Sequence, residues 1–329
     1  MPLLRRLAAP LLIALSLAAG CASQPAPPRP WVETAARELN LALGSFELQG
    51  RRVTVTRSNL ATTGPLPVVV YLPGLGQGSD AGQRWAAAWA QAGYTVLAVQ
   101  PLEADAAAWR SELSRTGEFR ELGLRHYGDA LRAERLAALR RLLPALRAAQ
   151  PALDWGRAAL AGYETGAQTA LDARGDTGWQ AVIAISPPAM QAPSAGAATL
   201  LITSDIDHDP LGLVRHPAER RQAFDTLASG SGWLLNLGGV PHAALAGTLA
   251  PEGWHEQDQH RQRGGGGMGE RGGGGPTGPA GGGGRGPRSG SATEAAQIDV
   301  GEGLRLSRAF LDAQLRGAAM PISAALSAR

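Results

Sequence analysis

A short segment near the middle of the chain, residues 158–167, constrains the fold more than any other. Its sequence is Ala-Ala-Leu-Ala-Gly-Tyr-Glu-Thr-Gly-Ala, a run of small and apolar residues that leads into glycines at positions 162 and 166. The run is typical of a buried strand, and the two glycines allow the backbone to turn sharply into a helix expected at 167–173. Such a turn pushes its middle side chain out from the edge of a sheet. Here that side chain is Glu164.

Strand-like and helix-like segments alternate on both sides of this turn. Continuous apolar runs rich in β-branched residues predict buried strands, and amphipathic segments between them predict helices. This alternation predicts an α/β fold with a mostly parallel central sheet that is covered by helices on both faces. The predicted strands are 45–48, 52–57, 66–72, 94–100, 181–186, 199–203 and 233–237, and the predicted helices are 35–42, 81–92, 127–149 and 304–315.

The N-terminal residues are expected to be an export signal. Two arginines precede an apolar run at 7–17, and small residues lead to Cys21, the only cysteine of the chain. The segment resembles a bacterial lipoprotein signal over 1–20, with Cys21 as the lipidated residue; an ordinary secretory signal with an incidental cysteine is the alternative. Residues 21–30 are rich in proline and predict a stiff tether to a membrane. The expected location is therefore the periplasm, anchored to a membrane, with the outer membrane favoured.

The remainder, residues 31–329, is expected to be one domain. The apolar content of the whole chain, 44%, is sufficient for a large core. A Gly-rich stretch at about 256–292 cannot bury a core and predicts a disordered insertion. Its arginines superficially resemble those of RNA-binding tails, but an exported protein is not expected to bind nucleic acid, and the net charge of +3 says little about partners. A single cysteine permits neither an internal disulfide nor a Cys-based metal site.

Five further stretches carry a family resemblance through their order and spacing. Together with the turn at Glu164, they resemble the α/β-hydrolase fold family, and most closely its small dienelactone-hydrolase and acetylhydrolase-like members. The resemblance covers about Val53 to Gly247 and the last helix. The chain departs from the family where a proline replaces the histidine of the His-Gly loop and where Glu164 replaces the nucleophilic serine. The matching stretches are Pro73-Gly74-Leu75-Gly76, 89–99, 153–162, 200–207 and Gly238-Gly239-Val240-Pro241-His242.

The resemblance implies a catalytic set. Glu164 stands at the nucleophile position, His242 at the position of the general base, and Asp207 at that of the acid which orients the imidazole. Imidazole suits the central role because its pKa is close to neutrality. Asp205 and Asp209 are rivals for the role of the acid.

Two backbone N–H groups, those of Leu75 and Thr165, are implied as the donors of an oxyanion hole. No metal site or cofactor is predicted. The alternation of Asp205, Asp207 and Asp209 vaguely resembles a calcium loop, but the glycine and the terminal glutamate of such a loop are absent.

The reaction depends on how Glu164 is interpreted. A serine is activated when an imidazole removes its proton, whereas a glutamate is already ionised near neutral pH and is expected to pair with His242 and raise its pKa. Glu164 could act as a general base on water, or as a carboxylate nucleophile like the aspartates of dehalogenases and epoxide hydrolases. Ser186, Thr165 and Ser204 are alternative nucleophiles, although none lies at the apex of the turn.

Two functions therefore remain open. The first is a lipid-anchored hydrolase that cleaves a small ester or a related bond with a non-standard residue at the nucleophile position. The second is a catalytically inactive relative that binds a small molecule or serves as a scaffold in the periplasm. The segment between Ser186 and Leu200 is too short for a cap domain, which argues against long-chain lipases and against the capped relatives.

Overall fold

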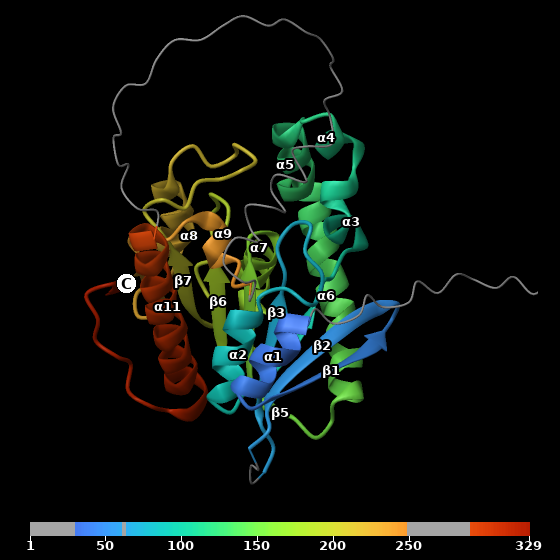
Figure 1. Ribbon diagram of the computed structural model, residues 1–329, viewed down its shortest axis with the longest axis vertical. Coiled ribbons are helices and arrows are strands. Elements are labelled where there is room, and N and C mark those ends of the chain that lie inside the picture. Colours follow the sequence, from blue (N-terminus) through green and yellow to red (C-terminus); the bar gives the residue numbers. More distant parts are fainter. Residues whose placement is uncertain (1–29, 61–63, 249–289) are drawn as a thin grey trace, which may run out of the picture.

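The computed structural model describes residues 30–60, 64–248 and 290–329, which form a mixed α/β fold around a 9-stranded sheet (Figure 1). The spatial order of the strands is β1-β2-β4-β3-β5-β6-β7-β8-β9. Neighbouring strands from β4 to β8 in this order are parallel, and β1, β2 and β9 add antiparallel pairs at the two ends. The predicted mostly parallel sheet is therefore confirmed. The strands are β1 (Leu41–Leu48), β2 (Arg51–Ser58), β3 (Pro67–Leu72), β4 (Thr95–Val99), β5 (Asp154–Tyr163), β6 (Ala181–Ile185), β7 (Ala198–Thr203), β8 (Gly232–Asn236) and β9 (Leu326–Ala328).

Helices connect the strands and cover both faces of the sheet. The parallel strands require crossover connections, and helices provide most of them. The helices are α1 (Pro30–Glu38), α2 (Gln83–Gln91), α3 (Glu103–Ala106), α4 (Glu112–Arg115), α5 (Phe119–Tyr127), α6 (Asp129–Ala149), α7 (Thr165–Asp172), α8 (Gln222–Thr226), α9 (His242–Leu245) and α11 (Gly290–Arg316), with short 3₁₀ turns at Ala108–Arg110, Ala173–Gly175 and Pro217–Arg221.

The burial of β3, which lies next to the central strand β5, explains why its sequence is apolar without interruption. Every residue of β3 is buried. Because side chains alternate between the faces of a sheet, Val69 and Tyr71 pack into the core on one side while Val68 and Val70 pack into the core on the other. A strand covered on both faces therefore has no polar position.

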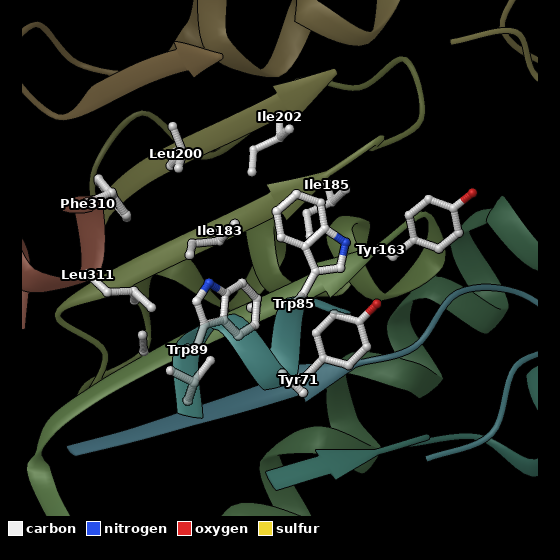
Figure 2. Packing of buried hydrophobic residues seen from close by; sticks show 14 of the residues in the cluster. Tyr71, Trp85, Trp89, Tyr163, Ile183, Ile185, Leu200, Ile202, Phe310 and Leu311 are labelled. Carbon is white, nitrogen blue, oxygen red and sulfur yellow. The ribbon is translucent and has the colours of Figure 1, made fainter. Parts of the chain in front are cut away.

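The first face is covered by α2, α9 and α11. Trp85 and Trp89 of α2 are fully buried and pack with Phe310 of α11 and with the strands (Figure 2). The Trp89 indole N–H donates a hydrogen bond to Ser307 Oγ at 3.0 Å, so the two helices are also joined by a polar contact. Truncating a buried tryptophan of this kind typically costs about 3–5 kcal/mol. The last helix is thus an integral part of the core.

The second face is covered by α6, α7 and α8. Leu139, Leu142 and Leu146 of α6 are three or four residues apart and so lie on one side of the helix, where they pack on β3, β4 and β5. Residues of α7 and α8 form a further buried cluster against β6 and β7. The two faces together hold β5, and with it the turn at Glu164, at the centre of the sheet.

Three segments differ from the sequence-based prediction. The helix predicted at 35–42 is wrong at its end, because α1 ends at Glu38, Asn40 turns with a φ of 54° and β1 pairs with β2 from Leu41 onward. The polar stretch 101–126 forms helices α3, α4 and most of α5. The short β9, which has no extended apolar run, was not predicted.

Several predictions concern residues outside those that the structure describes. The signal at 1–20, the lipidation of Cys21 and all of the tether at 21–30 except Pro30 are among them, as is most of the predicted Gly-rich insertion. After the undescribed residues 249–289 the chain resumes in α11. Within the described ranges, none of the helices has the length and hydropathy needed to cross a membrane.

Candidate functional site

Glu164 lies at the apex of a tight turn between β5 and α7. Its backbone has a φ of 49° and a ψ of −113°, which is rare for a residue with a side chain and typically costs about 1–3 kcal/mol. The two flanking glycines are required by close packing: a Cβ on Gly162 would overlap the backbone of Gly166, and one on Gly166 would overlap the carbonyl of Leu72. The turn is as tight as the sequence predicts, and it directs the Glu164 side chain toward the loops that follow the neighbouring strands.

His242 is the central group of the site. It begins α9, just after the loop that follows β8. Its Nε2 lies 2.6 Å from Glu164 Oε1, and its Nδ1 lies 2.6 Å from Asp207 Oδ1. The hydroxyl of Tyr163 donates to the carbonyl oxygen of His242, and the two rings are 5.5 Å apart. The structure therefore brings together the three side chains that the resemblance places in the catalytic set.

The three aspartates after β7 have different roles. Asp207 is fully buried and is the one that contacts His242. Asp205 accepts a hydrogen bond from the backbone N–H of Gly239 at 2.7 Å, and this bond lowers the pKa of Asp205. Asp209 accepts from the backbone N–H groups that follow it, at positions 211, 213 and 214. Both rivals therefore hold loops in place.

Ser186 and Arg220 complete the surroundings of Asp207. Ser186 follows β6 with a φ of 49°, and its hydroxyl lies 2.9 Å from Asp207 Oδ1 and 3.1 Å from His242 Nδ1. Arg220 is buried with its Nε 3.3 Å from Asp207 Oδ2. Ser186 is fully buried on the Asp207 side of the imidazole, so its position suits a hydrogen-bonding role better than that of a displaced nucleophile.

The second carboxylate oxygen of Glu164 is bound by the loop after β3. The backbone N–H of Leu75 donates to Glu164 Oε2 at 3.1 Å. The loop itself is held by Gln77, whose Oε1 accepts from Gly74 N–H, and by Gln100, whose amide donates to the carbonyls of Gly74 and Gln77. The predicted oxyanion donor Leu75 is thus well positioned, and in this structure it binds the chain's own carboxylate.

The second predicted oxyanion donor, Thr165, and the remaining alternative nucleophile, Ser204, have other surroundings. Thr165 is the first residue of α7, so its backbone N–H has no acceptor within the helix. Its hydroxyl is buried without a hydrogen-bond partner in the described part of the chain. Ser204 bonds to Asp205 and to the backbone of Ile206 and does not contact the imidazole.

The charges of the site determine its protonation state. Burial alone lowers the pKa of His242, but hydrogen bonds from the imidazole to Asp207 and Glu164, together with their negative charges, outweigh it and raise the pKa from 6.5 to about 9. Burial raises the pKa of Asp207, but the hydrogen bond from His242 and the charge of Arg220 outweigh it and keep the pKa below its ordinary value. Near neutral pH the imidazole is therefore protonated and donates to a carboxylate on each side.

The resulting cluster is electrically neutral. Two carboxylates, Glu164 and Asp207, face two cations, the His242 imidazolium and the Arg220 guanidinium. Buried charges are tolerated when they are paired and hydrogen-bonded in this way. An imidazolium can donate a proton to a reacting group but cannot accept one until it has done so. The resting site is thus suited to proton donation and to anion pairing.

A small helical cover lies over the loop that carries Leu75. Figure 1 shows α3, α4 and α5 at the end of the molecule toward which the arrows of β6 and β7 point. Leu75 packs there with Ala108 and Leu122, and the Trp109 indole donates to its carbonyl oxygen at 3.1 Å. The segment between β6 and β7 is short, as the sequence indicates, but the connection between β4 and α6 supplies this cover instead.

A buried ion pair joins this cover to the rest of the molecule. Asp105 of α3 binds Arg135 of α6 with an Nε–Oδ2 distance of 2.5 Å, and its other oxygen lies 2.8 Å from His126 Nδ1. Arg135 also donates to Gln168 of α7. The Asp105 carbonyl accepts from the backbone N–H of Gly76. The network therefore links the cover, the Leu75 loop and the helix that follows Glu164.

Sequence reasoning did not identify Arg220 or the roles of Ser186 and Tyr163. The sequence Pro-Ala-Glu-Arg-Arg around Arg220 indicates an exposed charged turn, and nothing in it marks one arginine as buried. The positions of Tyr163 and Ser186 near the site could have been predicted, since each stands at the end of a predicted strand. Their partners come from loops distant in sequence, which no local pattern reveals.

Comparison with known proteins does not extend these findings. No family model matches the chain, and no curated protein is similar to it. Within residues 30–60, 64–248 and 290–329, no group of three or more His, Cys, Asp or Glu side chains is arranged to hold a metal ion. The function must therefore be argued from the geometry of the site.

Proposed function

We propose that the chain is a relative of the α/β-hydrolases in which the serine-type reaction has been replaced by a stable ion pair. The order of the strands supports this assignment, as does the position of Glu164, Asp207 and His242 after β5, β7 and β8 respectively. All three residues lie in loops at the carboxyl ends of parallel strands, where α/β proteins place their ligands.

The observation that carries the proposal is the double engagement of the Glu164 carboxylate. One oxygen is hydrogen-bonded to His242 Nε2, the nitrogen that would accept a proton from a serine. The other accepts a hydrogen bond from the Leu75 N–H, the group that would bind an oxyanion. An ester entering this site would find the base protonated and the donor in use. The geometry therefore favours the second expected function, a protein that does not hydrolyse esters and uses the site for binding a small molecule in the periplasm.

A carboxylate-dependent hydrolase is the second candidate, and the position of Glu164 Oε2 on the Leu75 N–H favours it specifically. In this reaction Glu164 Oε1 attacks a saturated carbon of a strained ether such as an epoxide, and the carbon–oxygen bond breaks. The imidazolium of His242 gives its proton to the departing oxygen and becomes neutral. Neutral His242, oriented by Asp207, then removes a proton from water, which attacks the ester carbon at Glu164 and releases a diol.

Turnover measurements on the purified full-length chain distinguish the candidates. We expect no hydrolysis of short-chain esters above the level of the His242→Ala variant. We also expect Glu164→Ser to gain weak esterase activity, since it frees both the imidazole and the Leu75 N–H. Ester hydrolysis by the parent chain that is lost in Glu164→Gln and His242→Ala would contradict the proposal.

Epoxide substrates test the second candidate with the same variants. Turnover that both substitutions abolish, with a mass increase of the intact protein equal to one substrate and located at Glu164, would establish the carboxylate reaction. If the parent chain neither turns over epoxides nor becomes labelled, this candidate is rejected.

A further inference from the structure

Arg220 is a buried arginine, 2% exposed, that contacts three parts of the site. Its Nε donates to the carbonyl oxygen of Asp207 at 3.0 Å, and the same atom lies 3.3 Å from Asp207 Oδ2. Its Nη1 donates to the carbonyls of Ser186 and Pro187 at 3.2 and 2.8 Å. Its Nη2 lies 3.5 Å from His242 Nδ1. One guanidinium therefore touches the acid, the imidazole and the loop after β6.

These contacts fix the distance between two loops. The Ser186 loop follows β6 and the Asp207 turn follows β7. The backbone N–H of Ser186 still donates to Ile202 of β7, whereas that of Asp207 donates to Ser204 within its own turn. A guanidinium presents its donors in a rigid plane, so bonding three carbonyls at once locks their relative positions. Ser186, with its strained φ of 49°, is held within 2.9 Å of Asp207 by this arrangement.

Arg220 also balances the charge of the cluster. Without it, Glu164 and Asp207 would share one imidazolium, and the buried group would carry a net negative charge. No other cation is bonded to Asp207 in the described ranges apart from His242. The neighbouring titratable groups do not substitute for it: Tyr127 and Tyr163 have raised pKa values because they are buried and close to Glu164, and Asp209 adds a further negative charge.

We propose that Arg220 is the positioning residue of this site: it fixes Asp207 against His242 and supplies a second positive charge beside the Asp207 carboxylate. It acts through Asp207. The inference concerns the same ion-paired site as the proposed function, but it holds whether or not the chain catalyses a reaction.

Arg174 offers a matched control. It is also a buried arginine, 1% exposed, and it also bonds to loop carbonyls, those of Pro193 and Ala197. Its remaining partner is the hydroxyl of Thr199, and within the described part of the chain it forms no ion pair with a carboxylate. Replacing Arg174 removes a buried guanidinium without changing the charge around His242.

The test measures the NMR signal of the proton on His242 Nδ1, which is hydrogen-bonded to Asp207, in the full chain labelled with nitrogen-15 histidine. The pH is lowered stepwise, and the pH at which the signal disappears is the acid limit. The signal is assigned by its loss in His242→Gln, and circular dichroism restricts the comparison to pH values at which each variant is folded. In Arg220→Gln we expect the signal to disappear on acidification at a pH higher by about one unit or more, since an adjacent cation typically changes the pKa of a carboxylate by one to three units. Arg220→Lys cannot bond three carbonyls in one plane but keeps the positive charge that sets this acid limit, so its limit should stay close to that of the parent chain; Arg174→Gln should match the parent.

Each outcome decides the proposal. A signal that is absent at every pH in folded Arg220→Gln and restored by Arg220→Lys also supports it. An unchanged acid limit in Arg220→Gln, or an equal change in Arg174→Gln, overturns it. Should Arg220→Gln fail to fold, Arg220→Lys decides alone: retention of the parent's acid limit supports the charge role, and its loss rejects it. Ester turnover does not enter this measurement, so failure of the proposed function is seen separately.

Discussion

His242 Nε2 and Glu164 Oε1 are 2.6 Å apart, a short contact between an imidazolium and a carboxylate in a largely buried setting. Charge-assisted hydrogen bonds of this length are among the stronger polar interactions in proteins. The contact gives the histidine a proton that it would not hold alone near neutral pH. The most direct predictions follow from this proton.

Replacing Glu164 with glutamine should lower the pKa of His242. Glutamine has nearly the same shape but no charge, so one of the two carboxylates that raise the pKa is removed, and we expect it to fall from about 9 toward 6.5. NMR titration of the histidine ring measures this value. Glu302→Gln, on the exposed surface of α11, is the control and should leave it unchanged. A pKa that stays near 9 in Glu164→Gln would show that Glu164 is not the cause.

The stability of the fold should decrease as the medium becomes alkaline. The pKa of His242 is higher in the folded chain than its ordinary value of 6.5, so its contribution is complete below pH 6.5 and is lost as the pH rises toward about 9. The full difference corresponds to at most roughly 3 kcal/mol. Urea unfolding at a series of pH values measures the free energy of unfolding.

His242→Gln is the control for this alkaline effect. The variant should be less stable near pH 7 and should lose most of the dependence over this interval. Because the buried tyrosines also ionise on unfolding at higher pH, the comparison ends near pH 9.5, below their ordinary pKa of about 10. A parent chain with a flat profile from pH 6.5 to 9 would contradict the prediction.

Alanine at Gly166 should prevent the turn from closing. Its Cβ would overlap the carbonyl of Leu72 in β3, at the centre of the sheet, where the backbone cannot move aside. We expect loss of soluble folded protein or a decrease in melting temperature of many degrees. Gly301→Ala is the matched control, because nothing lies within 4 Å of the added Cβ and alanine favours a helix by about 1 kcal/mol. Equal stability of the two variants would refute the argument.

Breaking the Asp105–Arg135 pair should be far more costly than breaking an exposed one. Both side chains are fully buried, so Arg135→Met leaves the buried Asp105 carboxylate with only its His126 contact, and breaking a buried pair by removing one partner typically costs about 3–5 kcal/mol. Arg140 lies on the same helix as Arg135 and pairs with Asp176, and the two side chains are 53% and 27% exposed. Arg140→Met should therefore cost only about 0–1 kcal/mol. Denaturant unfolding of the two variants compares them directly. Similar losses would mean that the buried network is not important for stability.

Much of the fold is predictable from sequence because its strongest signals are local. The uninterrupted apolar run of β3 and the glycines beside Glu164 encode a buried strand and a tight turn within a few residues. The order of strands then places Asp207 and His242 after the neighbouring strands β7 and β8, and in the structure the Asp207 carboxylate contacts the His242 imidazole. The edge strand β9 has only three residues, Leu-Ser-Ala, which are too few and too mixed in polarity to form a strand pattern, so its pairing depends on tertiary contacts that no local pattern records.

The charge state of the site is less predictable. The sequence indicates that Glu164 would pair with His242, but it contains no sign that Oε2 would reach the Leu75 N–H, 89 positions away. Arg220 is hidden for the same reason, since its burial is decided by carbonyls of Ser186 and Pro187 more than 30 positions earlier. A local charged turn looks the same whether its arginine is solvated or enclosed.

The hydrogen bond from Trp89 to Ser307 joins residues 218 positions apart, and it has a consequence for biosynthesis. During translation α2 is made early, but the helix that covers its tryptophans is made near the end. Until α11 has been synthesised, Trp85 and Trp89 lack part of their apolar covering. The nascent chain then exposes an apolar surface of the kind that chaperones bind. Folding of this domain is therefore expected to finish after translation, at a rate limited by long-range contacts.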